Sequence, residues 1–341
     1  MNQVRLGRTG ITTPQNAFGA LPIQRVSFDE AAFLLRRALE GGMTFIDTAR
    51  AYSDSEEKIA YALPGRRHEY TLATKTMART PEGFWKDLHT SLTNLKTDHI
   101  DIYQFHCVDQ CYREGDGSGM YECMLEAKKQ GKILHISATA HKIGVAREIV
   151  ESGLYDTLQF PFSYLSGEQE LDLVRRCREK DVGFIAMKAL SGGLITNSAA
   201  AFAFIAQFDN VLPIWGVQRP HELEEFLSYM ENPPALDDAM RALIDGDRKE
   251  LSGDFCRGCG YCMPCPAGIQ INNAARMIQL IRRSPSANWL DEKAQAMMGR
   301  IAGCLHCNKC MQHCPYGLKI PDLLQKNYED YKKIVAGEIR V

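Results

Sequence analysis

The stretch FDEAAFLLRRALEGGMTFID, residues 28–47, contains the unit from which the fold is built. In residues 28–42, apolar side chains recur at three- and four-residue steps and two glycines follow, which predicts an amphipathic helix that ends there. Residues 43–47, MTFID, form a short and almost continuous apolar run, as expected of a strand covered on both faces. A helix that leads directly into such a strand predicts alternating helices and parallel strands.

Short apolar runs of the same kind recur along the chain. Further strands are expected near residues 16–19 and at 70–75, 99–106, 132–138, 156–160, 182–188 and 211–216. Helical patterns separate them, for example at residues 81–98, where a proline stands in the first turn. About eight such strand-helix units predict an α/β fold, a closed (β/α)8 TIM barrel over residues 1–232. A doubly wound open sheet remains the alternative from periodicity, although no GxGxxG follows an early strand.

The barrel pattern ends at a pair of prolines. Pro233 and Pro234 cannot continue a helix, so the domain boundary is placed there. The rest of the chain, residues 233–341, is expected to form a small, mainly helical domain.

Composition excludes several classes of function. The 341 residues include 40 basic and 42 acidic side chains, so no charge excess marks a partner such as nucleic acid or an anionic membrane. No apolar run approaches the ~20 residues of a membrane span, and the N-terminus lacks the apolar segment of a secretory signal. A cytoplasmic protein is expected, in which the twelve cysteines favour metal ligation over disulfides.

Eight of the twelve cysteines fall into two runs with iron–sulfur spacing. The runs are CRGCGYCMPCP at residues 256–266 and CLHCNKCMQHCP at residues 304–315. The second has the spacing C-x2-C-x2-C-x3-C-P of bacterial two-cluster ferredoxins, and the first is one residue shorter before its fourth cysteine. In that pattern the fourth cysteine ligates the other cluster. One [4Fe–4S] cluster is therefore expected on Cys256, Cys259, Cys262 and Cys314, and a second on Cys304, Cys307, Cys310 and Cys265. Two structural zinc sites remain the alternative, because paired C-x2-C is also a zinc signature.

Polar side chains stand where the predicted strands end. Asp47, Lys75 and His106 are at three such ends, and Tyr52 follows five residues after Asp47. Barrel enzymes draw catalytic residues from several strands at this face. His141 follows another predicted strand and is expected in a loop or in the substrate pocket.

Over residues 4–230 the chain resembles the aldo-keto reductases, through LGRTG, FIDTARAY, LATK and IYQFH. With its cysteine-rich end, it resembles the members of that family that are fused to a C-terminal ferredoxin-type domain. The resemblance implies a catalytic tetrad of Asp47, Tyr52, Lys75 and His106 for carbonyl and alcohol redox chemistry. Tyr52 would donate a proton to the substrate oxygen, and Lys75 would lower the pKa of Tyr52. Asp47 would orient Lys75, and His106 would position the substrate oxygen.

The resemblance also implies a nicotinamide site, which the sequence matches in part. Ser137 and Gln159 match, whereas Ala138 and Met187 replace an asparagine and a stacking tyrosine of ordinary members. Glu222 stands where NADP-preferring members often carry arginine, so NAD is at least as well suited as NADP. The expected contacts are Ser137, Gln159, Lys188, Gly192, Gly193, Gly216, Gln218, Arg219 and Glu222.

Two hypotheses of different classes follow. In the first, an oxidoreductase acts on a small carbonyl or alcohol while its clusters exchange single electrons with a carrier such as ferredoxin or flavodoxin. In the second, an electron-transfer or redox-sensing protein binds a nicotinamide or a partner in its barrel without turnover. A third interpretation makes the clusters purely structural. Nicotinamides exchange hydride and cubanes exchange single electrons, and no flavin motif that would connect the two is visible.

Overall fold

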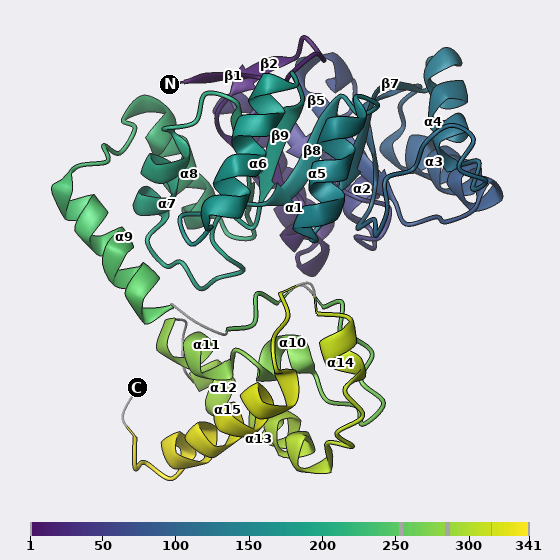
Figure 1. Ribbon diagram of the computed structural model, residues 1–341. Helices are drawn as coiled ribbons and strands as arrows, with labels where there is room; N and C mark the ends of the chain where they lie inside the picture. The colour runs from purple at the N-terminus through teal and green to yellow at the C-terminus, as the bar shows by residue number, and fades with distance from the viewer. Residues whose placement is uncertain (1, 252–254, 259, 284–286, 315, 340–341) are drawn as a thin grey trace. The chain divides into compact units, whose positions relative to one another are not determined.

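The computed structural model describes residues 2–251, 255–258, 260–283, 287–314 and 316–339 (Figure 1). Contacts divide the chain into two compact units. The barrel unit comprises residues 1–189 and 199–236, and the C-terminal unit comprises residues 190–198 and 237–341. By their contacts, residues 190–198 group with the C-terminal unit, although β9 before them and most of α7 after them belong to the barrel unit. The division of the chain at residue 232 stays a prediction.

Eight of the described strands close into a parallel barrel, in which the last strand pairs with the first. They are β3 (Ala17–Gly19), β4 (Phe45–Asp47), β5 (Thr71–Thr76), β6 (Ile100–Phe105), β7 (Ile133–Thr139), β8 (Thr157–Pro161), β9 (Gly183–Met187) and β10 (Val211–Gly216). The predicted TIM barrel is confirmed, and the open sheet is excluded. Each strand lies within about two residues of its predicted position, because an apolar run covered on both faces is a strong signal.

Helices surround this barrel and cover its strands. They are α1 (Phe28–Glu40), α2 (Ser55–Ala62), α3 (Pro81–Leu95), α4 (Met120–Lys129), α5 (Ile143–Ser152), α6 (Glu168–Glu179), α7 (Ser198–Ile205) and α8 (Pro220–Glu231), with short 3-10 turns at Pro22–Arg25 and Arg67–Glu69. Helix α1 begins at a capping box, in which Ser27 and Glu30 each bond the other's backbone N–H, and it ends at Gly41 as predicted. Figure 1 shows α5 and α6 over the outer side of β8 and β9.

A hairpin that the sequence did not reveal closes one end of the barrel. Strand β1 (Gln3–Arg5) pairs antiparallel with β2 (Thr12–Pro14). Val4 and Leu6 are fully buried in a cluster with side chains from the barrel strands, including Phe45 and Ile102. This apolar plug leaves the opposite end, where the parallel strands finish, as the place for a polar site.

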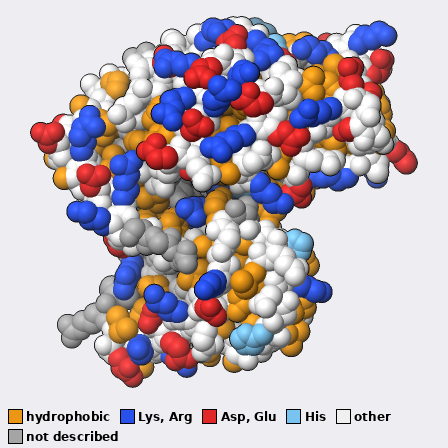
Figure 2. All heavy atoms as spheres, viewed as in Figure 1, with side chains coloured by type: hydrophobic (Ala, Val, Ile, Leu, Met, Phe, Trp, Pro, Cys, Tyr) orange, Lys and Arg blue, Asp and Glu red, His pale blue; other side chains and the backbone are white. Residues whose placement is uncertain are grey.

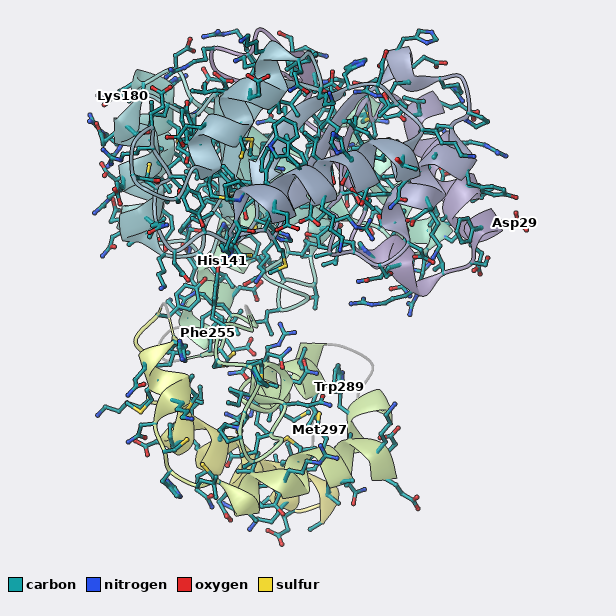
Figure 3. All side chains as sticks on the ribbon, turned by 90° about the vertical axis from the view of Figure 1, so that its right-hand side faces the viewer. Asp29, His141, Lys180, Phe255, Trp289 and Met297 are labelled. Carbon is teal, nitrogen blue, oxygen red and sulfur yellow. The ribbon has the colours of Figure 1, made fainter. Side chains whose placement is uncertain are left out.

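The C-terminal unit is helical, as predicted. Its elements are α9 (Asp238–Glu250), α10 (Ile271–Ala274), α11 (Met277–Arg283), α12 (Ala287–Leu290), α13 (Glu292–Gly299), a 3-10 turn at Arg300–Gly303, α14 (Lys309–Gln312) and α15 (Ile320–Val335). Its core includes Ile271, Met277 and Leu324, and Trp289 and Met297 pack against that core (Figure 3). No helix within the described ranges is long and apolar enough to span a membrane.

Candidate functional site

A buried ion pair lies where β4 and β5 end. Lys75 Nζ donates to Asp47 Oδ2 at 2.7 Å and to the carbonyl oxygen of Thr48 at 2.6 Å. The two charged side chains are only 2% and 1% exposed as residues. Burial raises the pKa of Asp47 and lowers the pKa of Lys75, and their mutual attraction opposes both shifts. Both groups can stay charged in this buried position because each compensates the charge of the other.

A row of polar side chains from the next strands supports Asp47. Gln104 Nε2 donates to Asp47 Oδ1 at 3.2 Å, and Ser137 Oγ donates to Gln104 Oε1 at 3.2 Å. Gln159 also helps to lower the pKa of Asp47 by hydrogen bonding, and its Oε1 is buried without a hydrogen-bond partner in the described part of the chain. Gln104 was missed as a site residue, although a glutamine inside the apolar strand IYQF is itself a signal of a polar barrel interior.

Tyr52 and His106 lie beside the ion pair. Lys75 Nζ is 5.3 Å from the centre of the Tyr52 ring, and the ring of Tyr52 meets that of His106 edge to face at 5.8 Å. Tyr52 follows β4 in a turn, and the backbone N–H of His106 donates to Thr76 O at 2.9 Å directly after β6. The structure therefore brings the four predicted residues together at one end of the barrel.

The pKa of Tyr52 is raised, not lowered as expected from the sequence. Burial is the main cause, and Asp47 and Cys107 add to it. The expected lowering was wrong because burial of the phenol outweighs the effect of Lys75, whose two hydrogen bonds go to Asp47 and Thr48. Burial lowers the pKa of His106 to about 3, with Lys75 and Arg79 adding to the shift, so this imidazole is neutral near neutral pH.

His141 and Cys107 complete this group of side chains. His141 is 6% exposed and follows β7 (Figure 3). Cys107 Sγ lies 4.0 Å from His141 Nδ1, and the backbone N–H of Cys107 donates to Thr139 Oγ1 at 2.7 Å. Cys107 adopts a positive φ of 53°, which is uncommon for a residue other than glycine. The sequence held one sign that Cys107 belongs to this group, because it directly follows the predicted site residue His106.

His141 is expected to make the barrel acid-sensitive. Burial lowers its pKa to about 3, with Lys188 and His106 adding to the shift. The unfolded imidazole titrates near pH 6.5, so in the window between about pH 6.5 and 3 only the unfolded state takes up the proton. The free energy of unfolding should therefore fall as the pH falls through this window, by up to about 1.4 kcal/mol per pH unit.

Chemical denaturation at several pH values between about 5 and 7, followed by circular dichroism, measures this slope. His141→Gln should reduce the slope by up to about 1.4 kcal/mol per pH unit without abolishing it, because the pKa of His106 is lowered in the same direction. His221→Gln, which changes an exposed imidazole on α8, is the matched control and should follow the unmodified protein. Equal slopes for His141→Gln and the unmodified protein would contradict the prediction.

The remaining predicted nicotinamide contacts fall into separate places. The backbone N–H groups of Gln218 and Arg219 both donate to Glu222 Oε2 at 2.9 Å, so a carboxylate of the protein itself already caps the N-terminus of α8. Gly216 ends β10, where an added Cβ would approach Pro22 Cγ to 3.1 Å. Lys188 follows β9 with a φ of 58°.

Gly192 and Gly193 belong to the C-terminal unit, unlike the other predicted nicotinamide contacts. Within that unit, Arg276 Nη1 donates to Gly192 O at 3.0 Å. The same guanidinium lies against Gly258, where an added Cβ would come within 2.9 Å of Arg276 Cζ. Burial lowers the pKa of Arg276, and the neighbouring Cys256 raises it. A cation of the C-terminal unit therefore lies between the glycine-rich turn and the first cysteine run.

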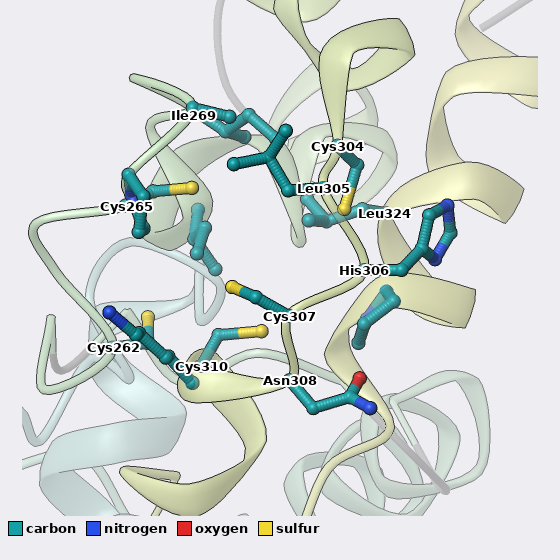
Figure 4. Close-up of a pocket in the computed structure, with 15 residues that line it drawn as sticks. Cys262, Cys265, Ile269, Cys304, Leu305, His306, Cys307, Asn308, Cys310 and Leu324 are labelled. Carbon is teal, nitrogen blue, oxygen red and sulfur yellow. The ribbon is translucent and has the colours of Figure 1, made fainter.

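Thiols from both cysteine runs line one pocket in the C-terminal unit. The pocket is bordered by Cys262 and Cys265 of the first run and by Cys304, Cys307 and Cys310 of the second (Figure 4). Figure 4 shows the sulfur atoms of Cys265, Cys304 and Cys307 turned toward the pocket, whereas the side chains of His306 and Asn308 point away from it. Five thiols around one space suit an iron–sulfur cubane, although no three such side chains among the described residues are close enough together to hold a single metal ion.

The other predicted ligands are placed as follows. Cys256 is buried, and Cys262 and Cys314 are partly buried against the core of the unit. Cys259 lies outside the described residues. Burial raises the pKa of Cys310, and Cys304 and Cys265 raise it further, which places Cys265 close to the second run.

Comparisons with known proteins agree with both parts of this architecture. The family model described as aldo/keto reductase family matches residues 15–203, and the model described as 4Fe-4S dicluster domain matches residues 255–319. Among curated proteins, the uncharacterized oxidoreductase YqkF of Bacillus subtilis is 26% identical over 211 residues, which cover 58% of this chain and 67% of that protein. The aldo-keto reductase YhdN of Bacillus subtilis is 29% identical over 181 residues, which cover 48% of this chain and 53% of that protein.

Solved structures show the same fold. A putative aldo-keto reductase from Pseudomonas aeruginosa superposes with a TM-score of 0.58 at 22% identity, covering 71% of this chain and 95% of that one. The holo form of aldo-keto reductase AKR11C1 from Bacillus halodurans superposes with a TM-score of 0.63 at 19% identity, covering 72% of this chain and 96% of that one.

Proposed function

Because the chain belongs to the aldo/keto reductase family and carries a 4Fe-4S dicluster domain, we propose that it is an oxidoreductase that interconverts a small carbonyl compound and its alcohol at Asp47, Tyr52, Lys75 and His106. The observation that carries the proposal is the buried Lys75–Asp47 pair beside the ring of Tyr52. An ion pair with 1% and 2% exposure is costly to bury, and its position at the end of a barrel favours a catalytic purpose.

Tyr52 is suited to donate the proton in carbonyl reduction. Its hydroxyl makes no hydrogen bond to another described residue, so it is free to meet a substrate oxygen. Its raised pKa keeps it protonated across the physiological range. A nicotinamide held in the barrel would supply hydride, and the substrate oxygen would then need a proton. The phenolate left on Tyr52 is stabilised by the Lys75 ammonium near its ring.

His106 is suited to orient the substrate oxygen. Because its pKa is lowered to about 3, the imidazole is neutral and can donate one hydrogen bond without placing a charge in the buried site. Its Nδ1 is buried without a hydrogen-bond partner in the described ranges. The imidazole of His106 therefore still has a free hydrogen-bonding position beside Tyr52, and a bound substrate oxygen could fill it.

The barrel residues also fit a nicotinamide. Gln159 is 1% exposed, and its unpaired Oε1 is an acceptor that the amide of a nicotinamide can satisfy. At the adenosine end, the Glu222 carboxylate already occupies the N-terminus of α8 and would repel a 2′-phosphate. These contacts favour NAD over NADP.

The two cysteine runs are proposed to hold two [4Fe–4S] clusters with exchanged fourth ligands. The joint pocket supports Cys265 as the partner of Cys304, Cys307 and Cys310. Cys256, Cys259, Cys262 and Cys314 would then hold the other cluster. Cys262 also borders the joint pocket, and its place in the first run assigns it to the first cluster. Each cluster would exchange single electrons with a partner.

A second function, electron transfer or redox sensing without turnover, is favoured by two observations. Gly192 and Gly193, expected near a nicotinamide, lie in the C-terminal unit, where Gly192 accepts a hydrogen bond from Arg276. The replacement of the expected asparagine and tyrosine by Ala138 and Met187 points in the same direction.

An anaerobic titration separates the two functions. The protein should contain about eight iron atoms per chain, bind NADH more tightly than NADPH, and oxidise NADH when small aldehydes or ketones are added. Binding of NADH without carbonyl-dependent oxidation would favour the second function. Absence of both nicotinamide binding and turnover, in protein with its full iron content, would contradict the proposed reductase.

A further inference from the structure

We propose that the second cysteine run and its flanks form the docking surface for a small acidic ferredoxin, which passes one electron at a time to the cluster of Cys304, Cys307, Cys310 and Cys265. The proposal rests on the proposed function of the clusters, and it names the partner and the place of contact. We call this surface the docking loop, residues 302–309, together with the flanking side chains Arg300 and Lys319.

The docking loop exposes one ligand of the second predicted cluster more than any described ligand of the first. Cys307 is exposed and every residue from Leu305 to Lys309 is exposed, whereas Cys256 of the first run is 7% exposed. Electron transfer between proteins requires a close approach of the two cofactors. An exposed ligand therefore makes the second run the side from which a carrier can reach a cluster.

An apolar side chain stands at the centre of this loop. Leu305 is 66% exposed, the highest value among the large apolar side chains in the described ranges. It also lines the thiol pocket together with Lys309, so a protein that covers Leu305 lies against the cluster ligands (Figure 4). One apolar contact within a polar rim is typical of the small interfaces of transient redox partners.

Basic side chains predominate along this part of the chain. Residues 293–321 include Lys293, Arg300, Lys309 and Lys319 but no aspartate or glutamate, and the acidic residues Asp291, Glu292 and Asp322 stand just outside the two ends of this stretch. All four cations are exposed, and two exposed histidines, His306 and His313, lie among them. Arg300 Nη1 donates to Gly268 O at 3.2 Å, and Gly268 N–H donates to Cys265 O at 2.9 Å, which places this cation beside a cluster ligand. Figure 2 shows pale blue imidazoles next to orange apolar atoms on the lower unit.

An acidic ferredoxin fits this surface in chemistry and in charge. Its reduced cubane loses one electron and the cubane of this chain gains one, with no bond made or broken and no proton transferred. Carboxylates around the carrier's cofactor would face the cations around the docking loop, which steers association and makes its rate depend on salt. The observed surface, with one leucine and several cations, suits such a brief encounter better than a permanent complex.

Anaerobic stopped-flow mixing tests the proposal. A reduced acidic two-cluster ferredoxin is mixed with the oxidised holoprotein, and cluster reduction is followed by absorbance. The second-order rate should fall by about tenfold or more as ionic strength rises from about 0.02 to 0.3 M. Lys309→Glu and Leu305→Asp should each lower the low-salt rate by about tenfold.

Two controls keep the result interpretable. Lys333→Glu makes the same charge change on the exposed side of α15 and should react at the unmodified rate. Lys319→Glu lies outside the cysteine run, so it tests the charge argument even if Lys309→Glu loses iron. Iron content and reduction by dithionite are measured for every variant, so that a lost cluster is not mistaken for lost docking.

The outcomes separate this proposal from the proposed enzyme activity. Equal rates for all variants, a rate independent of salt, or rapid reduction by a flavodoxin but not by the ferredoxin would each overturn the docking surface. NADH-dependent carbonyl reduction could persist in any of those cases. Conversely, salt-dependent reduction by ferredoxin in a protein that turns over no carbonyl would leave the docking surface intact and overturn the reductase.

Discussion

Tyr52→Phe is expected to lower kcat/KM for carbonyl reduction by about 10²–10⁴-fold. The change removes one hydroxyl, the group proposed to give its proton to the substrate oxygen, and leaves the ring beside Lys75 and His106 in place. Because no described residue bonds that hydroxyl, the fold should not change. Steady-state kinetics with NADH and a small aldehyde measure the effect.

The matched control for this prediction is Tyr61→Phe. Tyr61 lies on the exposed side of α2, and its hydroxyl donates to Asp29 on α1. Its removal should leave turnover unchanged. Nicotinamide binding and cluster absorbance should be equal in both variants. Turnover by Tyr52→Phe at the unmodified rate would remove Tyr52 from the mechanism.

Lys75→Met is expected to destabilise the barrel by about 3–5 kcal/mol and to abolish turnover. It leaves the Asp47 carboxylate 2% exposed, with the amide of Gln104 still donating to it but with its ammonium partner gone. The pKa of Asp47, already raised by burial, should rise further once Lys75 is removed. Denaturant unfolding followed by circular dichroism measures the loss.

Two further variants distinguish an unpaired buried charge from a simple loss of packing. Asp47→Asn combined with Lys75→Met removes both charges and should recover most of the stability without recovering turnover. Lys58→Met also removes a buried lysine, but its partner Asp54 is 42% exposed and stays in water, so its loss should be nearer to 1 kcal/mol. A Lys75→Met variant as stable as the unmodified protein would contradict the account of the ion pair.

Most of the barrel could be predicted from the sequence, because its signals are local. Strands such as residues 211–216 are continuous apolar runs, and the helix at residues 28–40 has its period and its terminal glycine within one short window. The β1–β2 hairpin was missed because QVR and TTP each bury only their middle residue and so form no apolar run, and their place is decided by burial of Val4 and Leu6 inside the barrel.

The members of the site were easier to predict than its electrostatics. Asp47, Lys75 and His106 follow from strand ends, since parallel strands finish at one face. The direction of the Tyr52 pKa shift is set mainly by how deeply the folded barrel buries the phenol, which no sequence pattern contains. Cys107 was overlooked for the same reason, because its proximity to His141 arises from two different strands.

Long-range contacts also determine with which unit the glycine-rich turn packs. SGGL at residues 191–194 follows a barrel strand in sequence, which is why it was expected to contact a nicotinamide. In the structure the turn clusters with the C-terminal unit, where Gly192 bonds Arg276. A contact between residues 84 positions apart leaves no local trace in the sequence.

The hairpin plug has a consequence for how protons reach the tyrosine. Val4 and Leu6 fill one opening of the cylinder with fully buried aliphatic side chains, which offer a chain of water molecules no hydrogen-bond partners. If Tyr52 acts as proposed, we therefore expect its proton to be replaced through the opposite opening, through which substrate would also enter and product would leave. Reprotonation of Tyr52 and the exchange of substrate and product would then share one route, so a slowly released product would delay both.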